Sequence, residues 1–138
     1  MTSVLLDTGP IVAATSGSDS AHALVANWLS GFRDRFITTE AVVTEVAYVA
    51  TRDPKHRRAA LGWLQKLREM DMLIVHPIPD YLAVMDIVDR YGVARCDFAD
   101  ASLIDLGQRL GTNKIATLDR RDFSIYRIGR NQAFELVL

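Results

Sequence analysis

The sequence predicts an α/β domain in which a mainly parallel sheet is covered by helices on both faces. Short apolar runs alternate along the chain with helical segments of about ten residues or more, which is the pattern of βα units. No repeat, low-complexity tract or linker interrupts this alternation. The 138 residues, 49% of them hydrophobic, are enough for one buried core, so we expect residues 1–138 to form a single domain.

Five segments are predicted strands. The first, Val4-Leu5-Leu6, is a short apolar run that ends at Asp7. The later strands are expected at residues 35–38, 72–75, 114–118 and 135–138. The first strand therefore has an acidic residue at its carboxyl end, and in an open α/β sheet that edge is where ligands bind.

Apolar residues at three- and four-residue spacing predict the helices between these strands. We expect them at residues 11–15, 21–29, 40–51, 54–70, 81–91 and 97–110. Capping residues support their starts, at Asp19 or Ser20, at Thr38 or Thr39, and at Asp53, Asp80 and Asp97. Glycines mark several of their ends, at Gly31, Gly92 and Gly111.

Composition and charge limit what the chain can be. The formal net charge of −1 gives the surface no general attraction for polyanions, so any affinity for nucleic acid must come from local basic clusters or from a metal ion. The single cysteine, Cys96, excludes an internal disulfide and a thiolate zinc site, and we expect it to be a small core residue. No apolar run reaches membrane-spanning length and no basic leader precedes the first strand, so we expect a cytoplasmic protein without membrane attachment.

Two acidic residues stand at the carboxyl ends of predicted strands. Asp7 follows the first strand, and Asp119 follows the strand at 114–118. If these strands are parallel neighbours, both carboxylates lie at the same edge of the sheet. The alternative for each acid is that it begins a βα turn by accepting hydrogen bonds from nearby backbone amides.

Glu45 is a third acid of interest, because its predicted helical neighbours are mostly apolar. The residues three and four positions away on the same helix are Ala41, Val42, Tyr48 and Val49. A carboxylate that emerges from an apolar patch loses hydration, which is costly unless a cation or a hydrogen-bond donor compensates it. Alternatively, Glu45 lies at the edge of the helix and reaches water.

Asp97 and Asp100 are three residues apart at the start of the helix predicted for residues 97–110. This spacing is typical of an N-cap and an acid in the first turn, which the helix dipole stabilises without further function. At about 100° per residue, Asp100 lies roughly 80° from the centre of the helix's apolar stripe, and Asp97 about twice as far round. We therefore expect Asp100 to face a crevice at the core boundary and Asp97 to cap the helix.

Four carboxylates that share one crevice would repel one another unless a divalent cation neutralised them. Ligation by oxygen alone suits Mg²⁺ or Mn²⁺ rather than Zn²⁺, and His22, His56 and His76 show no spacing typical of a zinc site. A carboxylate-bound Mg²⁺ that keeps several waters can activate one of them against a phosphodiester. The acids therefore indicate metal-dependent phosphodiester hydrolysis.

The same acids lie in four segments that together resemble one known family. These are Leu-Leu-Asp7-Thr-Gly-Pro, Thr-Thr-Glu40-Ala-Val-Val-Thr-Glu45-Val, Ala-Asp100-Ala-Ser-Leu and Ala-Thr-Leu-Asp119-Arg-Arg-Asp-Phe. In this order and within this length, the chain resembles the PIN-domain ribonucleases, specifically the VapC-type toxins of bacterial toxin–antitoxin pairs. The resemblance covers nearly the whole chain, and Thr8 and Thr117 stand where the family often carries a hydroxyl.

The resemblance implies a three-layer α/β/α sandwich and a homodimeric endoribonuclease that depends on Mg²⁺ or Mn²⁺. It makes Asp7, Glu45, Asp100 and Asp119 the catalytic acids. Asp7 and Asp100 would ligate the metal directly, and Glu45 and Asp119 would complete the ring directly or through water. Asp97 precedes the third acid and could assist it. A cognate VapB-like antitoxin would inhibit the enzyme by placing its C-terminal segment in the groove.

Two groups of basic residues could hold an RNA strand by its phosphates. The first, near the start of the helix at 54–70, consists of Arg52, Lys55, His56, Arg57 and Arg58. The second is Arg120 and Arg121, directly after Asp119. For the first group, a solvated helix face is the competing interpretation.

The aromatic residues of the helices indicate packing rather than RNA binding. Trp28, Trp63 and Tyr48 stand at helical spacing, so we expect them in the core or in a dimer interface rather than as stacking platforms for bases.

Other classes of function remain open at this point. Leu-Leu-Asp7-Thr-Gly also resembles the active-site segment of dimeric aspartic proteases, which would require an all-β half-site where we expect many helices. A PIN-like fold could instead serve only as a non-catalytic partner-binding module. A Rossmann-like phosphatase is disfavoured, because no second aspartate stands two residues after Asp7.

Overall fold

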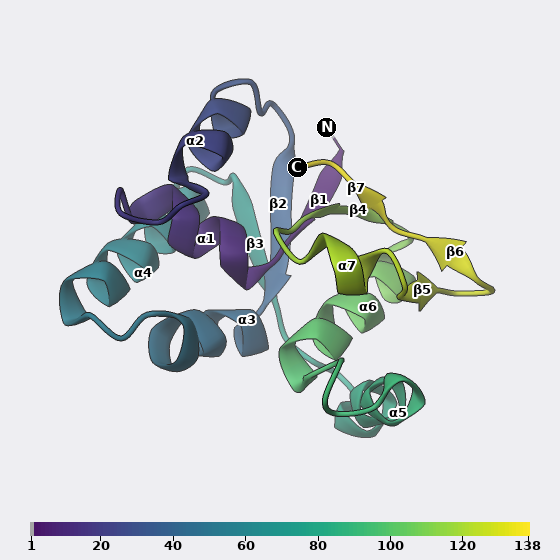
Figure 1. The fold of residues 1–138 in the computed structure, drawn as a ribbon. Helices are drawn as coiled ribbons and strands as arrows, with labels where there is room; N and C mark the ends of the chain where they lie inside the picture. Colours follow the sequence, from purple (N-terminus) through teal and green to yellow (C-terminus); the bar gives the residue numbers. More distant parts are fainter. Residues whose placement is uncertain (1) are drawn as a thin grey trace.

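The computed structural model describes residues 2–138, except for the side chains of residues 49 and 50. Its centre is a five-stranded sheet in the order β3-β2-β1-β4-β7 (Figure 1). The strands are β1 (Ser3–Leu6), β2 (Arg35–Thr39), β3 (Leu73–His76), β4 (Lys114–Ala116) and β7 (Glu135–Leu136). All four pairings in this sheet are parallel, which confirms the predicted sheet.

Helices cover both faces of the sheet, as Figure 1 shows. On one side lie α1 (Thr8–Thr15), α2 (His22–Ser30) and α4 (Pro54–Glu69), and on the other lie α5 (Tyr81–Tyr91) and α6 (Phe98–Leu110). Shorter elements complete the chain: α3 (Glu40–Glu45), the π-helical turn η1 (Val46–Ala50), α7 (Arg120–Phe123) and the antiparallel hairpin of β5 (Arg127–Ile128) and β6 (Gln132–Ala133). The protein is therefore a three-layer α/β/α sandwich.

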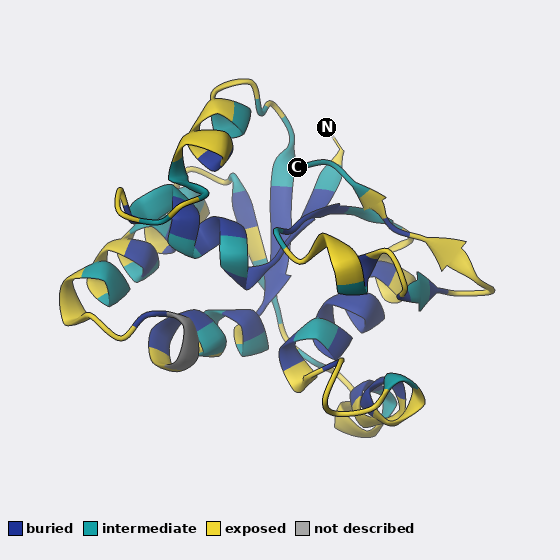
Figure 2. Cartoon of the chain, viewed as in Figure 1, coloured by how far each residue is buried: buried dark blue, intermediate teal, exposed yellow. Residues whose placement is uncertain are grey.

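The core lies between the sheet and the inner faces of the helices, where Figure 2 shows the buried residues. Val4, Leu5 and Leu6 of β1 are at most 2% exposed, so the central strand is buried on both faces. Cys96 is a buried core residue, as predicted.

The aromatic predictions are confirmed in part. Trp28 and Trp63 pack against the core, but Tyr48 is 77% exposed and so is no core residue. In residues 2–138, no helix has both the length and the apolar content needed to cross a membrane.

Helix caps agree with the sequence at most positions. Four predicted N-caps accept a backbone N–H from the first turn of their helix, namely Thr39, Asp53, Asp80 and Asp97. The cap of α2 differs, because Ala21 is its N-cap and Asp19 instead accepts a hydrogen bond of 2.8 Å from the Ala21 N–H.

Several boundaries also differ from expectation. The helix expected at 40–51 is divided into α3 and the π-helical turn η1, and the strand expected at 135–138 ends at Leu136. α1 begins at Thr8 rather than at residue 11, because Gly9 and Pro10 fit the first turn, where backbone N–H groups need no helical acceptor. The strand expected at 114–118 ends at Ala116, where the chain enters the turn before α7. Neither α7 nor the β5–β6 hairpin is predicted, because both are too short to show a hydrophobic period.

The order of the strands places a crevice beside β1. The chain adds β2 and β3 on one side of β1, and then β4 and β7 on the other side. At such a reversal the connections leave the sheet in opposite directions, which opens a crevice at the carboxyl ends of the strands. Leu6 of β1 pairs with Ala116 of β4, so Asp7 and Thr117 both lie at this crevice.

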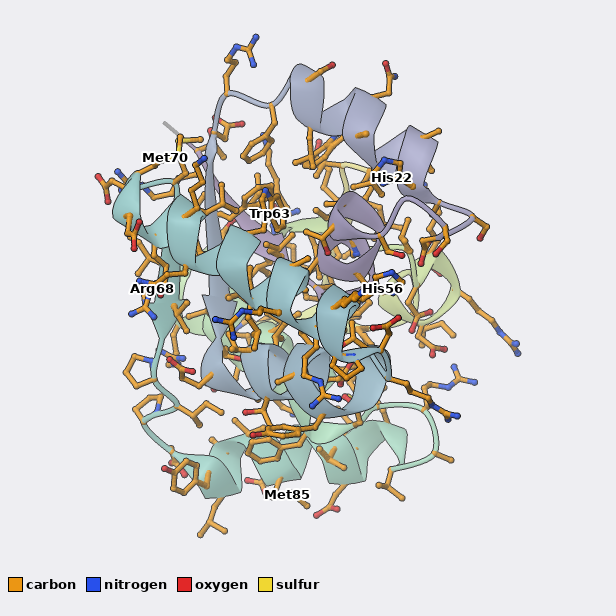
Figure 3. All side chains as sticks on the ribbon, turned by 90° about the vertical axis from the view of Figure 1, so that its left-hand side faces the viewer. His22, His56, Trp63, Arg68, Met70 and Met85 are labelled. Carbon is orange, nitrogen blue, oxygen red and sulfur yellow. The ribbon has the colours of Figure 1, made fainter. Side chains whose placement is uncertain are left out.

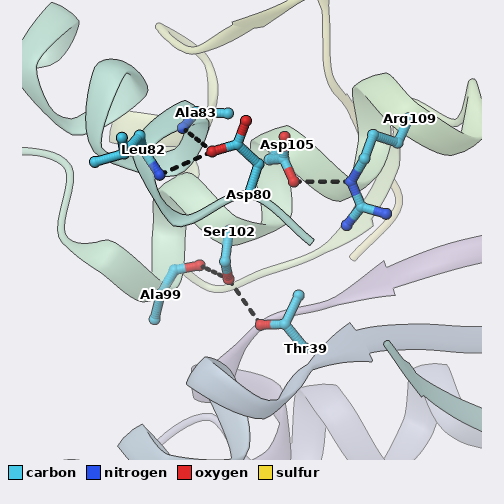
Figure 4. A network of polar contacts seen from close by, with 8 residues as sticks. All are labelled: Thr39, Asp80, Leu82, Ala83, Ala99, Ser102, Asp105 and Arg109. Atoms are coloured by element: carbon cyan, nitrogen blue, oxygen red, sulfur yellow. Dashed lines mark hydrogen bonds and ion pairs between the residues drawn. The ribbon is translucent and has the colours of Figure 1, made fainter. Parts of the chain in front are cut away.

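Buried contacts fix α6 against the sheet. The Ser102 hydroxyl donates to the carbonyl of Ala99 at 2.7 Å, so the Thr39 hydroxyl, 2.7 Å away, donates to Ser102 (Figure 4). Further along α6, a Cβ at Gly107 would lie only 2.8 Å from the Thr112 carbonyl oxygen and 3.2 Å from Leu5 Cδ1. The C-terminal part of α6 therefore needs a glycine at this position to lie this close to Leu5 and to the Thr112 backbone.

Candidate functional site

Asp7 lies at the carboxyl end of β1, and its Oδ2 accepts a hydrogen bond of 2.7 Å from the Thr117 hydroxyl. The residue is 7% exposed, and burial raises its pKa from 3.8 to about 6. Hydrogen bonding from Thr117 and the Thr8 backbone lowers this pKa, whereas the charges of Asp119 and Asp97 raise it. Asp7 is the N-cap residue of α1, but its side chain makes no capping hydrogen bond, so capping does not explain why an acid is buried here.

Asp100 stands in the first turn of α6 and is half-buried at the edge of the core, as its helical angle predicts. Its pKa is raised to about 8, first by burial and then by the charges of Asp7, Asp97, Glu45 and Asp119. These acids come from separate segments of the chain. Because each of them acts on the Asp100 carboxyl, the fold gathers their negative charge around one place.

Tyr126 is a residue of this site that the sequence does not point to. Its ring is fully buried and packs edge-on against Tyr91 and Phe123. Its hydroxyl lies 2.7 Å from the Arg95 carbonyl oxygen and 3.3 Å from Asp100 Oδ2, so it can donate to either oxygen. Burial, followed by the charge of Asp100, raises the pKa of Tyr126, which keeps the hydroxyl a donor.

Glu45 ends α3 and is half-buried. Its pKa is raised to about 7, mainly by burial and in addition by the charges of Asp97 and Asp7. The Thr8 hydroxyl lies near enough to lower this pKa, yet Thr8 Oγ1 is buried and makes no hydrogen bond of ordinary distance and angle with any described residue.

The apolar patch expected around Glu45 is present only in part. Val42 is buried and Ala41 is half-buried, but Tyr48 is exposed, and the side chain of Val49 lies outside the described residues. Glu45 therefore owes its burial to packing against the crevice as well as to its own helix.

Asp119 combines the two positions that the sequence offered as alternatives. Its carboxylate caps α7 by accepting a hydrogen bond of 3.2 Å from the Asp122 N–H, and its own N–H donates to Thr117 Oγ1 at 3.0 Å. It is exposed, but its charge also raises the pKa of Asp7 and Asp100. Although the residue is exposed, partial desolvation of its carboxyl raises the pKa of Asp119 itself.

Asp97 caps α6 as predicted, with Oδ1 accepting a hydrogen bond of 2.8 Å from the Asp100 N–H. Its charge raises the pKa of Asp7, Glu45 and Asp100, so it belongs to the same group of acids. We refer to Asp7, Glu45, Asp97, Asp100 and Asp119 together as the acidic cluster.

A groove of about 480 Å³ opens directly beside the acidic cluster. Glu45 and Asp97 form part of its wall, and Ile78 and Phe98 give it an apolar lining. A nucleic-acid strand or a protein segment that lies in this groove would therefore pass next to the acids.

The second basic group is partly engaged within the protein. The Arg120 guanidinium donates to the backbone carbonyl of Leu138, and Arg121 is exposed.

The chemistry of the donors fits a divalent cation. The acidic cluster offers carboxylate oxygens, and the buried Thr8 hydroxyl beside it lacks a hydrogen-bond partner among the described residues. Hard oxygen donors with excess negative charge suit Mg²⁺ or Mn²⁺. As the side chains stand, no three His, Cys, Asp or Glu residues within 2–138 are gathered closely enough to ligate an ion.

Comparison with known proteins gives a consistent picture. A family model described as the PIN domain matches residues 4–130. Ribonuclease VapC26 of Mycobacterium tuberculosis is 30% identical over 126 residues, which cover 90% of this chain and 92% of VapC26.

The fold also has a close counterpart among solved structures. The crystal structure of Mycobacterium tuberculosis VapC20, described as a Sarcin-Ricin loop cleaving toxin, matches with a TM-score of 0.72 at 16% identity. The match covers 86% of this chain and 92% of VapC20. The aspartic-protease alternative is wrong, because Asp7 begins a βα unit in a parallel sheet and not an all-β half-site. On the match to residues 4–130 and the similarity to VapC26, the chain belongs to the PIN domain family, within its VapC group.

Proposed function

We propose that this chain is a metal-dependent endoribonuclease and the toxin of a toxin–antitoxin pair. The observation that carries the proposal is the acidic cluster beside the groove, in which Asp7 is buried at the carboxyl end of β1 and Glu45 and Asp97 line the groove; burial and mutual charge raise the pKa of Asp7, Glu45 and Asp100. Acids held together in this way are stabilised by a divalent cation. The similarity to VapC26, which is named a ribonuclease, supports RNA as the substrate.

In this proposal Asp7 and Asp100 hold Mg²⁺ or Mn²⁺, and Glu45 and Asp119 complete the ring directly or through water. The bound cation would supply an activated water and stabilise the leaving oxygen of the phosphodiester.

The remaining groups of the site position these acids. The Thr117 hydroxyl orients Asp7, and the Tyr126 hydroxyl and the capping bond to Asp97 orient Asp100 and its helix. Without a cation, burial and the charges of Asp97 and Asp7 raise the pKa of Glu45 to about 7, and a bound cation would favour its ionised form.

We also propose that two chains form a homodimer and that a VapB-like antitoxin inhibits the enzyme. Exposed apolar residues support such contacts, among them Tyr81 and Leu82 of α5 and Tyr48 of η1. A segment of the antitoxin placed in the groove beside Glu45 and Phe98 would cover the acidic cluster.

The function is tested by incubating the purified protein with total RNA in the presence of Mg²⁺ or of EDTA. We expect cleavage with Mg²⁺ and intact RNA with EDTA. Equal cleavage under both conditions would contradict a metal-dependent mechanism. Intact RNA in both would favour the non-catalytic partner-binding module instead.

A further inference from the structure

The start of α4 carries a group of cations that the acidic cluster does not use. Arg52, Lys55, Arg57 and Arg58 lie close together in the sequence, and α4 starts between the first two. None of the four forms an ion pair with an acidic side chain of residues 2–138, where the ion pairs involve Arg35, Arg109 and Lys114. The positive charge of this segment is therefore not compensated by the protein itself.

Two of these cations border a hollow on the surface of α4. The hollow has a volume of about 650 Å³, and besides Arg57 and Arg58 it is lined by Pro54, Leu61, Gly62 and Gln65. These residues recur every three or four positions, so they form one face of the helix. A Cβ at Gly62 would meet no heavy atom within 4 Å, so the space above the helix is open there.

Arg57 is held in place without an acceptor for its inner N–H. Its side chain is half-buried, and its Nε is buried with no hydrogen-bond partner among the described residues. The buried Nε fixes the position of the side chain, and an anionic oxygen can form charge-assisted hydrogen bonds with the outer nitrogens of the guanidinium. The guanidinium is thus pre-positioned by packing rather than by an acidic partner.

The hollow also has a structural connection to the acidic cluster. α4 contacts α1 and η1, which directly follow Asp7 and Glu45 in the chain. An RNA strand that leaves the crevice over these helices would therefore run toward α4. Because the formal net charge of the whole chain is −1, a polyanion needs a local site of this kind.

We propose that the hollow on α4 is a phosphate-binding subsite, in which Arg57 and Arg58 hold the RNA backbone at a distance from the scissile bond. This inference rests on the proposed ribonuclease function and adds a second point of contact with the substrate. Guanidinium groups suit this role because they can bind a phosphate through two parallel hydrogen bonds.

The test measures binding of a single-stranded oligouridylate of about 20 nucleotides. Binding is measured in EDTA over a series of salt concentrations, so that no cleavage competes. Arg57→Gln and Arg58→Gln are each expected to weaken binding about tenfold. Each is also expected to reduce the slope of log affinity against log salt by about 0.7.

Arg68→Gln is the matched control. Arg68 is an exposed arginine in the last turn of α4, and Figure 3 shows it at the opposite end of the helix from His56, which is in the first turn. Its replacement removes the same charge from the same helix and is expected to leave binding and salt slope unchanged. If Arg57→Gln and Arg58→Gln bind RNA as tightly as Arg68→Gln and the wild type do, the subsite is wrong. Binding of polyglutamate is measured alongside. If Arg57→Gln and Arg58→Gln lose binding to polyglutamate but keep binding to RNA, the subsite is also wrong, and an acidic protein partner is favoured.

Two further measurements separate this inference from other effects. Arg58 is exposed, so Arg58→Gln is expected to keep the wild-type melting temperature even if Arg57→Gln does not. RNA cleavage by the wild type tests the proposed function independently of the subsite. If the wild type cleaves RNA while Arg57→Gln and Arg58→Gln bind RNA like Arg68→Gln, the proposed ribonuclease function is supported and the subsite is wrong. If the wild type does not cleave RNA but Arg57→Gln and Arg58→Gln lose RNA binding, the hollow binds RNA and the proposed ribonuclease function is wrong.

Discussion

Asp7→Asn and Asp100→Asn are each expected to reduce the rate of RNA cleavage at least about a thousandfold. Asparagine keeps the shape of aspartate but removes the negative charge that we propose to ligate the cation. A loss of about 4 kcal/mol of transition-state stabilisation, which is typical for the effect of a catalytic metal, corresponds to that factor. The measurement is the initial rate of cleavage at saturating Mg²⁺.

Asp86→Asn provides the control. Asp86 is exposed on α5, so this substitution removes the same charge at a position outside the acidic cluster. It is expected to cleave at the wild-type rate. If Asp7→Asn and Asp100→Asn also cleave at that rate while remaining folded, the acidic cluster is not the catalytic centre.

In EDTA, the same Asp7→Asn substitution is expected to stabilise the protein at pH 8. Burial raises the pKa of Asp7 from 3.8 in the unfolded chain to about 6 in the folded protein, so folding takes up protons between these values. The folded protein is therefore most stable with respect to this group below about pH 4, where the carboxyl is protonated in both states, and it loses that stability as the pH rises through about 6 and the buried carboxyl ionises. The difference between the two pKa values corresponds to about 3 kcal/mol in the free energy of unfolding, and the asparagine variant should regain this amount at pH 8.

Urea unfolding in EDTA at pH 8 and at pH 4 measures this effect. The gain in the free energy of unfolding should be present at pH 8 and absent near pH 4, where the wild-type carboxyl is protonated. With Mg²⁺ in excess, the order should reverse, since the cation stabilises only a protein that binds it. If the variant is less stable than the wild type in EDTA at pH 8, the hydrogen bond from Thr117 outweighs the cost of burying the charge.

Local patterns in the sequence account for much of the acidic cluster. Asp7 was predictable because an apolar strand stops at it, and Asp97 because it stands three residues before another acid at a helix start. The boundary position of Asp100 followed from the helical angle alone. Caps, strand ends and helical angles depend on neighbours within a few residues, so a sequence carries them directly.

Other features of the site depend on contacts between distant segments. Tyr126 reaches Asp100 across 26 positions, and only the packing of its ring against Tyr91 and Phe123 brings the hydroxyl there. The burial of Glu45 likewise comes in part from the crevice, since Tyr48 of η1, three residues further on, is exposed. No local pattern encodes such contacts, because they join segments that are far apart in the chain.

The dual role of Asp119 explains why the sequence left two interpretations open. The residue caps α7, which is the purely structural role, and its charge also acts on Asp7 and Asp100. An acid in the turn that follows a strand can serve both purposes, because the carboxyl edge of a parallel sheet is also where the following helices begin.

The most direct test of the proposed metal centre is a calorimetric titration of the wild type, Asp7→Asn and Asp100→Asn with Mn²⁺ at pH 7, in buffers of different ionisation enthalpy. The wild type should bind the cation and release protons, because carboxyls with pKa values of about 7 and about 8, at Glu45 and Asp100, must ionise to neutralise it. Both variants should bind at least about a hundredfold more weakly, since each lacks one ligand charge. If they bind Mn²⁺ with wild-type affinity, or if the wild type binds it without releasing protons, the cation is not held by these acids.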